Sequence, residues 1–105
     1  MRVDTDLLSS IYMERLQSLR GRAEESGISK SGSVEVLRAR LISNLVLSDM
    51  DLSWEGIQSM SHKEMGEVLK VFGIKSSGSH KERRQRLWLH LNYDSRRMTI
   101  ENLAE

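Results

Sequence analysis

Apolar residues recur at steps of three and four positions along most of the chain, which is the spacing of an amphipathic α-helix. The first such pattern predicts a helix over residues 5–25, with Asp4 or Thr5 as its N-cap. The second predicts a helix that Ser33 caps and that ends near Val46. No segment alternates apolar and polar residues as a half-buried strand does, so the pattern predicts an all-α protein.

The second half of the chain carries two further helical patterns. Ser61 and Glu64 form a Ser-x-x-Glu capping box, which predicts the start of a third helix. Ser79 precedes a fourth apolar stripe and is placed to cap it. Between the two halves, residues 47–53 predict a linker, and residues 54–58 predict a short turn of helix.

The two halves share one sequence motif. A shift of 46 residues places residues 27–33, Gly-Ile-Ser-Lys-Ser-Gly-Ser, on residues 73–79, Gly-Ile-Lys-Ser-Ser-Gly-Ser. The match continues in the following helix, with Arg38 on Arg84, Arg40 on Arg86, and Leu41 on Leu87. A repeat of this length predicts two copies of one helix-turn-helix unit, and so about four main helices.

This repeat divides the chain into four parts. Residues 1–47 form a first unit with an extended N-terminal helix, residues 48–58 a linker, and residues 59–93 a second unit. The tail, residues 94–105, resembles the opening of the third helix and is either a short helix or the start of a third copy. One position breaks the repeat, because Leu37 becomes Arg83; we expect the Arg83 stem to lie on Trp88 or the core edge and its guanidinium to point outward.

Composition excludes several classes of function. The 105 residues include no Cys, and His62, His80 and His90 form no i, i+4 pair, so neither a metal site nor a cofactor is expected. No catalytic triad, phosphate loop or dinucleotide fingerprint is present, which argues against an enzyme or a small-molecule substrate. No apolar run approaches the roughly 20 residues of a membrane span. These features predict a cytoplasmic, nucleoid-associated protein or a nuclear one.

Charge distinguishes the two copies. The formal net charge is only +1, yet residues 75–97 hold seven basic residues against two acidic ones, Glu82 and Asp94. The basic residues are Lys75, Lys81, Arg83, Arg84, Arg86, Arg96 and Arg97. The second copy is therefore the electropositive one.

Both copies resemble the SAP motif, a helix-extended-helix module associated with chromatin and nucleic-acid proteins. The first copy matches it in Leu19, Ala23, Gly27, Ile28, Ser31, Gly32, Ser33, Leu37, Arg40 and Leu41, and the second in Met65, Leu69, Gly73, Ile74, Ser77, Gly78, Ser79, Arg86 and Leu87. Val34 and His80 stand where the family has Lys. The resemblance covers most of the chain and implies a two-helix fold for each copy, with DNA binding as its function.

Elementary chemistry points to the same ligand. A Ser-Gly-Ser turn before a helix presents backbone N–H groups at the positive end of the helix dipole, and a glycine there admits a phosphate without a Cβ in the way. We expect the second copy to contact double-stranded DNA weakly through its backbone, with a weaker contribution from the first. The expected contacts are Lys75, Ser77, Gly78, Ser79, His80, Lys81 and Arg84, then Lys30, Ser31, Gly32, Ser33 and Arg38.

Two alternatives remain open. A Ser-Gly-Ser sequence also serves any helix-turn-helix as a turn and an N-cap, so the turns could be purely structural. Related helix-extended-helix modules bind proteins, which makes a protein-interaction module within a nucleic-acid assembly the second hypothesis.

Overall fold

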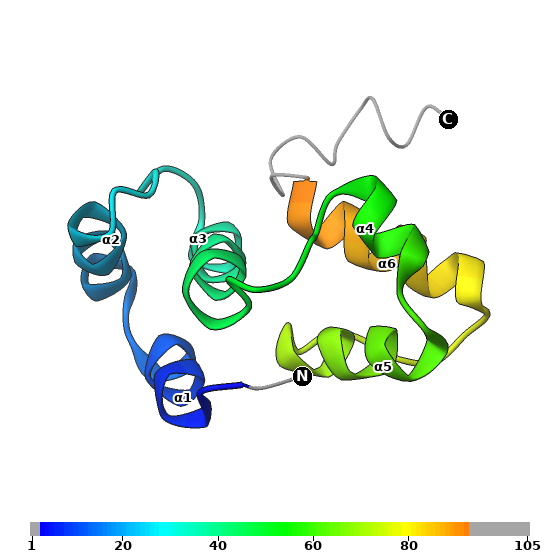
Figure 1. Cartoon of the computed structure of the whole chain (residues 1–105). Coiled ribbons are helices and arrows are strands. Elements are labelled where there is room, and N and C mark those ends of the chain that lie inside the picture. The colour runs from blue at the N-terminus through cyan, green and yellow to red at the C-terminus, as the bar shows by residue number, and fades with distance from the viewer. Residues whose placement is uncertain (1–2, 93–105) are drawn as a thin grey trace.

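The computed structural model describes residues 3–92, and no strand occurs in that range (Figure 1). Its α-helices are α1 (Thr5–Met13), α2 (Leu16–Glu25), α3 (Val34–Leu41), α4 (Trp54–Ser59), α5 (His62–Val71) and α6 (His80–Asn92), and the π-helix η1 (Ile42–Val46) continues α3. The all-α prediction is confirmed. The predicted tail, residues 94–105, lies outside the described residues.

The helices form two copies of a three-helix unit. The bounds of α2, shifted by 46 residues, are those of α5, and the same shift places the end of α1 on the end of α4 and the start of α3 on the start of α6. In the second unit both α4 and α5 pack against α6. The segment expected as a helical turn within a linker is therefore the first helix of the second unit.

The single helix predicted over residues 5–25 is wrong, because the chain is extended at its middle. Glu14 has a ψ of 148° and Arg15 a ψ of 166°, so α1 ends at Met13 and α2 begins at Leu16. Tertiary packing gives the reason: α1 packs against α3 and η1, while α2 packs against α3. Two separate helices can surround α3, whereas one straight helix cannot. An ion pair between Arg22 and Glu14 spans the break.

Local capping follows the prediction closely. Ser33, Ser61 and Ser79 each accept a hydrogen bond from the backbone N–H three residues later, at distances of 3.3, 3.1 and 3.2 Å. Gly27 and Gly73 both have a φ of 68°, the left-handed conformation that ends a helix and that glycine adopts without strain. Each unit therefore stops its middle helix and starts its last helix by the same means.

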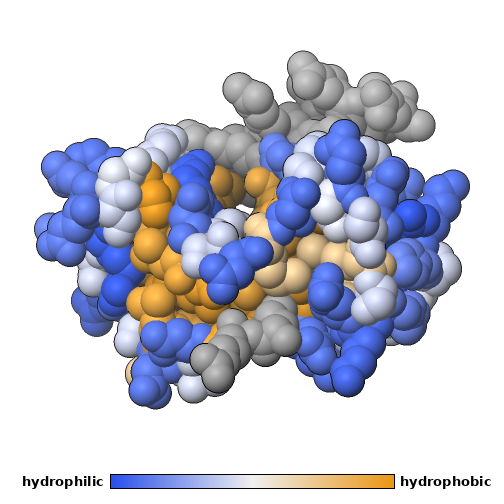
Figure 2. All heavy atoms as spheres, viewed as in Figure 1, coloured by the Kyte–Doolittle hydropathy of each residue, from blue (hydrophilic) through white to orange (hydrophobic). Residues whose placement is uncertain are grey.

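One apolar core runs through both units. Its fully buried side chains include Ile11, Leu19, Leu37, Leu41, Ile57, Met65, Leu69 and Leu87. The units join where α3 packs against α6. In Figure 2 apolar residues gather in the middle of the visible face, and hydrophilic residues cover its two ends.

Candidate nucleic-acid interface

An arginine from the last helix holds each Ser-Gly-Ser turn. Nη1 of Arg86 donates to the backbone carbonyl oxygens of Lys75 at 2.5 Å and Ser77 at 2.8 Å. In the first unit, Nη1 of Arg40 donates to the equivalent carbonyls of Ser29 and Ser31, at 2.6 and 2.8 Å. The Arg that precedes Leu in both copies is thus a clamp that fixes the shape of the turn.

The clamp decides where the backbone donors of the second turn point. In a planar trans peptide the C=O of one residue and the N–H of the next point in opposite directions. Because the carbonyls of Lys75 and Ser77 face Arg86, the N–H groups of Ser76 and Gly78 face away from it. Neither N–H donates a hydrogen bond to any group within residues 3–92. Two backbone donors of this turn, two residues apart, are therefore without a partner among residues 3–92.

The backbone conformation of both Ser-Gly-Ser turns requires glycine. Gly78 has a φ of 113°, and a Cβ there would lie 3.3 Å from Nη2 of Arg86. Gly32 has a φ of 103°, and a Cβ there would lie 3.0 Å from the Val36 side chain. These glycines hold the turn in shape, in addition to any room they leave for a phosphate.

A carboxylate occupies part of the N-terminus of α6. Glu82 Oε1 accepts a hydrogen bond of 3.3 Å from the N–H of Ser79, while the Ser79 Oγ accepts one from the N–H of Glu82. These hydrogen bonds with Ser79 lower the pKa of the Glu82 carboxyl. Glu82 therefore takes up one backbone donor at this end of the helix, and the N–H groups of Ser76 and Gly78 are left without a partner among residues 3–92.

The expected basic residues of the second unit lie close to this turn in sequence. Lys75 and Lys81 are exposed, and His80 and Arg84 are half-buried. Desolvation lowers the pKa of the His80 imidazole, and the nearby Arg84, His62 and Arg83 lower it further. Lys75 before the Ser-Gly-Ser turn and Lys81 after it are therefore the exposed cations among the expected residues.

The first turn has fewer unpaired cations. Lys30 forms an ion pair of 3.3 Å with Glu24. Arg38 does not reach the turn: its guanidinium lies 5.3 Å from the centroid of the Tyr12 ring and lines a cleft of about 260 Å³ between the units, together with Phe72 and His90. Figure 1 places the loop between α2 and α3 and the loop between α5 and α6 on opposite sides of the molecule.

Two residues that sequence reasoning did not assign to the site lie beside it. Arg83 does not point outward as expected; it is only 5% exposed, and its Nη1 lies 2.7 Å from the ring nitrogens of His62. His62 in turn lies with its ring centroid 5.8 Å from that of His80. A comparison of the two copies could have pointed to this cluster, because the first copy has Leu16 and Leu37 at the positions of His62 and Arg83.

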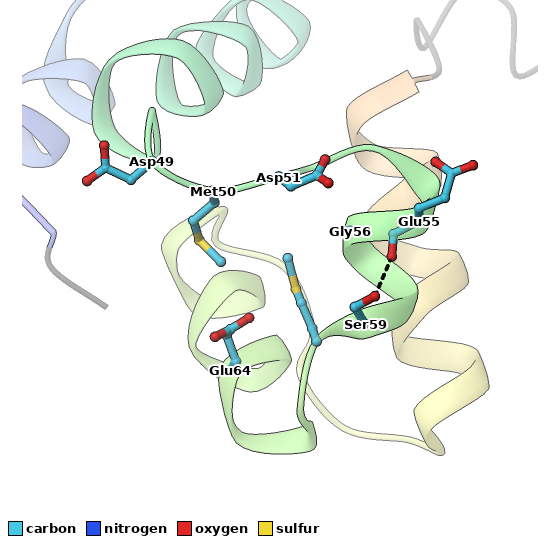
Figure 3. A pocket seen from close by; sticks show the side chains of 8 residues that line it. Asp49, Met50, Asp51, Glu55, Gly56, Ser59 and Glu64 are labelled. Atoms are coloured by element: carbon cyan, nitrogen blue, oxygen red, sulfur yellow. Dashed lines mark hydrogen bonds between the residues drawn. The ribbon is translucent and has the colours of Figure 1, made fainter.

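An acidic cleft lies elsewhere in the second unit. It has a volume of about 380 Å³ and is lined by the carboxylates of Asp49, Asp51, Glu55 and Glu64 and by the apolar side chains of Met50 and Met60. The Asp49 and Glu55 carboxylates point away from each other (Figure 3). Within residues 3–92 no three Asp, Glu, His or Cys side chains are grouped closely enough to hold a metal ion.

Comparison with known proteins assigns no relative. No protein-family model, curated protein or solved structure matches the chain. Among residues 3–92, no helix combines the length and the apolar character that crossing a lipid bilayer requires.

Proposed function

We propose that the chain is a non-catalytic, SAP-like DNA-binding module whose second unit contacts the phosphate backbone of double-stranded DNA. The observation that carries this proposal is the pair of outward N–H groups of Ser76 and Gly78, fixed by the Arg86 clamp. The exposed Lys75 and Lys81 add positive charge on either side of them. A nucleoid-associated or nuclear location belongs to the same proposal.

Contacts of this kind recognise the backbone more than the sequence. Backbone N–H groups and lysines bind phosphate oxygens, which carry no base identity. With three to five phosphates engaged, a fourfold rise in salt should weaken binding by roughly 50- to 500-fold, because each contact contributes about −0.9 to the slope of log K against log salt. Binding should therefore be weak at physiological salt and largely independent of sequence.

A residue-resolved NMR titration with a short duplex tests the proposal. Shifts should concentrate on the amides of residues 75–84 and fade as salt is raised. Lys75→Glu combined with Lys81→Glu should remove them, whereas Lys30→Glu in the other turn should change affinity little, since Lys30 is already paired with Glu24. A spectrum unmoved by DNA at low salt would refute the proposal and leave the turn a structural element.

A second candidate function is a protein-interaction module. The acidic cleft favours it, because carboxylates around an apolar floor of Met50 and Met60 suit a basic peptide segment. The test is specific: Glu55→Lys with Glu64→Lys should abolish partner binding and leave DNA binding intact or stronger.

A further inference from the structure

The helices α5 and α6 begin at the same end of the second unit (Figure 1). His62 is the first residue of α5 and His80 the first of α6, and the centroids of their rings lie 5.8 Å apart. The N-terminus of a helix carries the positive end of its dipole, so two such ends meet here. Arg83 and Arg84 add two guanidinium groups from the first turns of α6.

Arg83 is buried without an opposite charge. It is 5% exposed, and its Nε atom is buried and makes no hydrogen bond. Its Nη2 lies against Gly66, where a Cβ would come within 2.5 Å. Among residues 3–92 the ion pairs are Arg22 with Glu14 and Lys30 with Glu24, so no carboxylate there neutralises Arg83. Burying a charge in this way is unfavourable unless a counter-charge is supplied.

The first unit shows that the fold does not need this cluster. There the positions of His62, His80 and Arg83 are held by Leu16, Val34 and Leu37; Leu37 is buried in the apolar core, and Leu16 and Val34 are partly buried against it. Three apolar residues of one copy are thus replaced together by three basic ones in the other. The basic character of this helix end is therefore specific to the second unit.

We propose that His62, His80 and Arg84 form a phosphate-binding site at the shared N-terminal end of α5 and α6, with Arg83 as the residue that positions the His62 ring. This inference rests on the proposed DNA binding and adds to it a second phosphate contact beside the Ser-Gly-Ser turn. Nη1 of Arg83 lies 2.7 Å from both ring nitrogens of His62, and since a guanidinium only donates hydrogen bonds, the His62 ring accepts from it and is held at the start of α5. His62 itself is exposed, so its ring remains accessible to a phosphate.

The same arrangement couples binding to protonation. The ionisable groups that face the His80 ring are cationic or neutral, namely His62 from α5 and Arg83 and Arg84 from α6. The acids Glu55 of α4 and Glu64 of α5 line the acidic cleft instead. Without a bound anion, these neighbours favour the neutral form of the His80 imidazole at pH 7. The negative charge of a bound phosphate favours the protonated form instead. Phosphate binding therefore takes up a proton, and affinity rises as pH falls from 8 to 6.

Residues of the first copy supply the test variants. The full chain and two variants, His80→Val and the double variant His62→Leu with Arg83→Leu, would be titrated with a short duplex by fluorescence anisotropy at pH 6 and pH 8. We expect the wild type to bind several-fold more tightly at pH 6 than at pH 8, because the protonated His80 imidazole attracts the phosphate and the neutral one does not. The affinity of His80→Val for the duplex should differ little between pH 6 and pH 8. The double variant should weaken binding several-fold at both pH values.

Two controls separate this proposal from the preceding one. Circular dichroism and thermal denaturation should show both variants folded, since the first unit folds with Leu at the same positions. Inorganic phosphate should shift the His62 and His80 ring signals and compete with the duplex. If Lys75→Glu with Lys81→Glu abolishes binding but the cluster variants keep both affinity and pH ratio, the cluster is structural and this inference is overturned. If only the cluster variants lose affinity, the turn proposal fails and the cluster site stands.

Discussion

The hydroxyl of Tyr12 in α1 donates a hydrogen bond of 2.6 Å to the backbone carbonyl of Val71 at the end of α5. These residues are 59 positions apart in sequence and belong to different units. The Tyr12 ring also lies under the Arg38 guanidinium, with 5.3 Å between guanidinium carbon and ring centroid. Tyr12 thus connects the first unit to the second.

Removing this hydroxyl should weaken the connection between the units. Tyr12→Phe leaves the ring in place but leaves the Val71 carbonyl without its donor, so the free energy of unfolding should fall by about 1 kcal/mol. Urea denaturation followed by circular dichroism measures the change. An unaltered midpoint would show that water replaces the hydroxyl at no cost.

The same hydroxyl predicts a loss of stability in alkali. Burial raises the pKa of Tyr12 above its ordinary value of 10.0, although Arg38 opposes the shift. A group whose pKa is raised by folding contributes stability at pH values below its unfolded pKa, and this contribution is lost as pH rises through the folded value. The melting temperature should therefore fall above about pH 10 more steeply in the wild type than in Tyr12→Phe.

The arginine clamp should govern the stability of each turn. Arg86→Met keeps the aliphatic stem but removes the donor to the carbonyls of Lys75 and Ser77, so the free energy of unfolding should fall by about 2 kcal/mol. Arg40→Met should cost a similar amount in the first unit. Lys81→Met is the matched control, because Lys81 is exposed, and it should stay within about 0.5 kcal/mol of wild type. Equal effects of Arg86→Met and Lys81→Met in chemical denaturation would contradict the clamp.

Two glycines in helices should respond to alanine in opposite directions. A Cβ at Gly21 in α2 would meet no atom within 4 Å, so Gly21→Ala should stabilise the protein by about 0.5–1 kcal/mol through helix propensity. A Cβ at Gly56 in α4 would overlap the backbone carbonyl of Asp51, so Gly56→Ala should destabilise it by about 2 kcal/mol. Thermal denaturation of both variants tests this, and a stabilised Gly56→Ala would show that the linker has room to shift.

The ion pair across the break between α1 and α2 predicts sensitivity to acid. The hydrogen bond from Arg22 lowers the pKa of the Glu14 carboxyl below its ordinary value of 4.5. A carboxyl with a lowered folded pKa contributes stability above the unfolded value, and the contribution disappears as pH falls through the folded one. Glu14→Gln should therefore flatten the fall in melting temperature below pH 4.5, and Glu55→Gln serves as the control because Glu55 is exposed and lies away from Arg22. A Glu14→Gln profile parallel to that of the wild type would count against the ion pair.

The features that depend on a few neighbouring residues could be predicted from the sequence. Ser33, Ser61 and Ser79 cap helices because a side-chain oxygen satisfies an N–H three residues away, and such contacts need no tertiary partner. The break at Glu14 escaped prediction because Arg15 has no side chain that caps, while the apolar stripe continues across it. The 46-residue repeat nevertheless pointed to the break, because Arg15 corresponds to Ser61, which is the N-cap of α5.

The helical class, the repeat, the capping residues and the basic character of the second unit could be predicted from the chain alone, because periodicity, capping and charge are local properties. Which cations remain free of intramolecular contacts depends on how the helices pack. Packing placed Arg38 over Tyr12, paired Lys30 with Glu24, and buried Arg83 against His62. These contacts could not be predicted because they depend on the helices packed around each side chain. The spacing of residues along the chain does not specify how the two units meet.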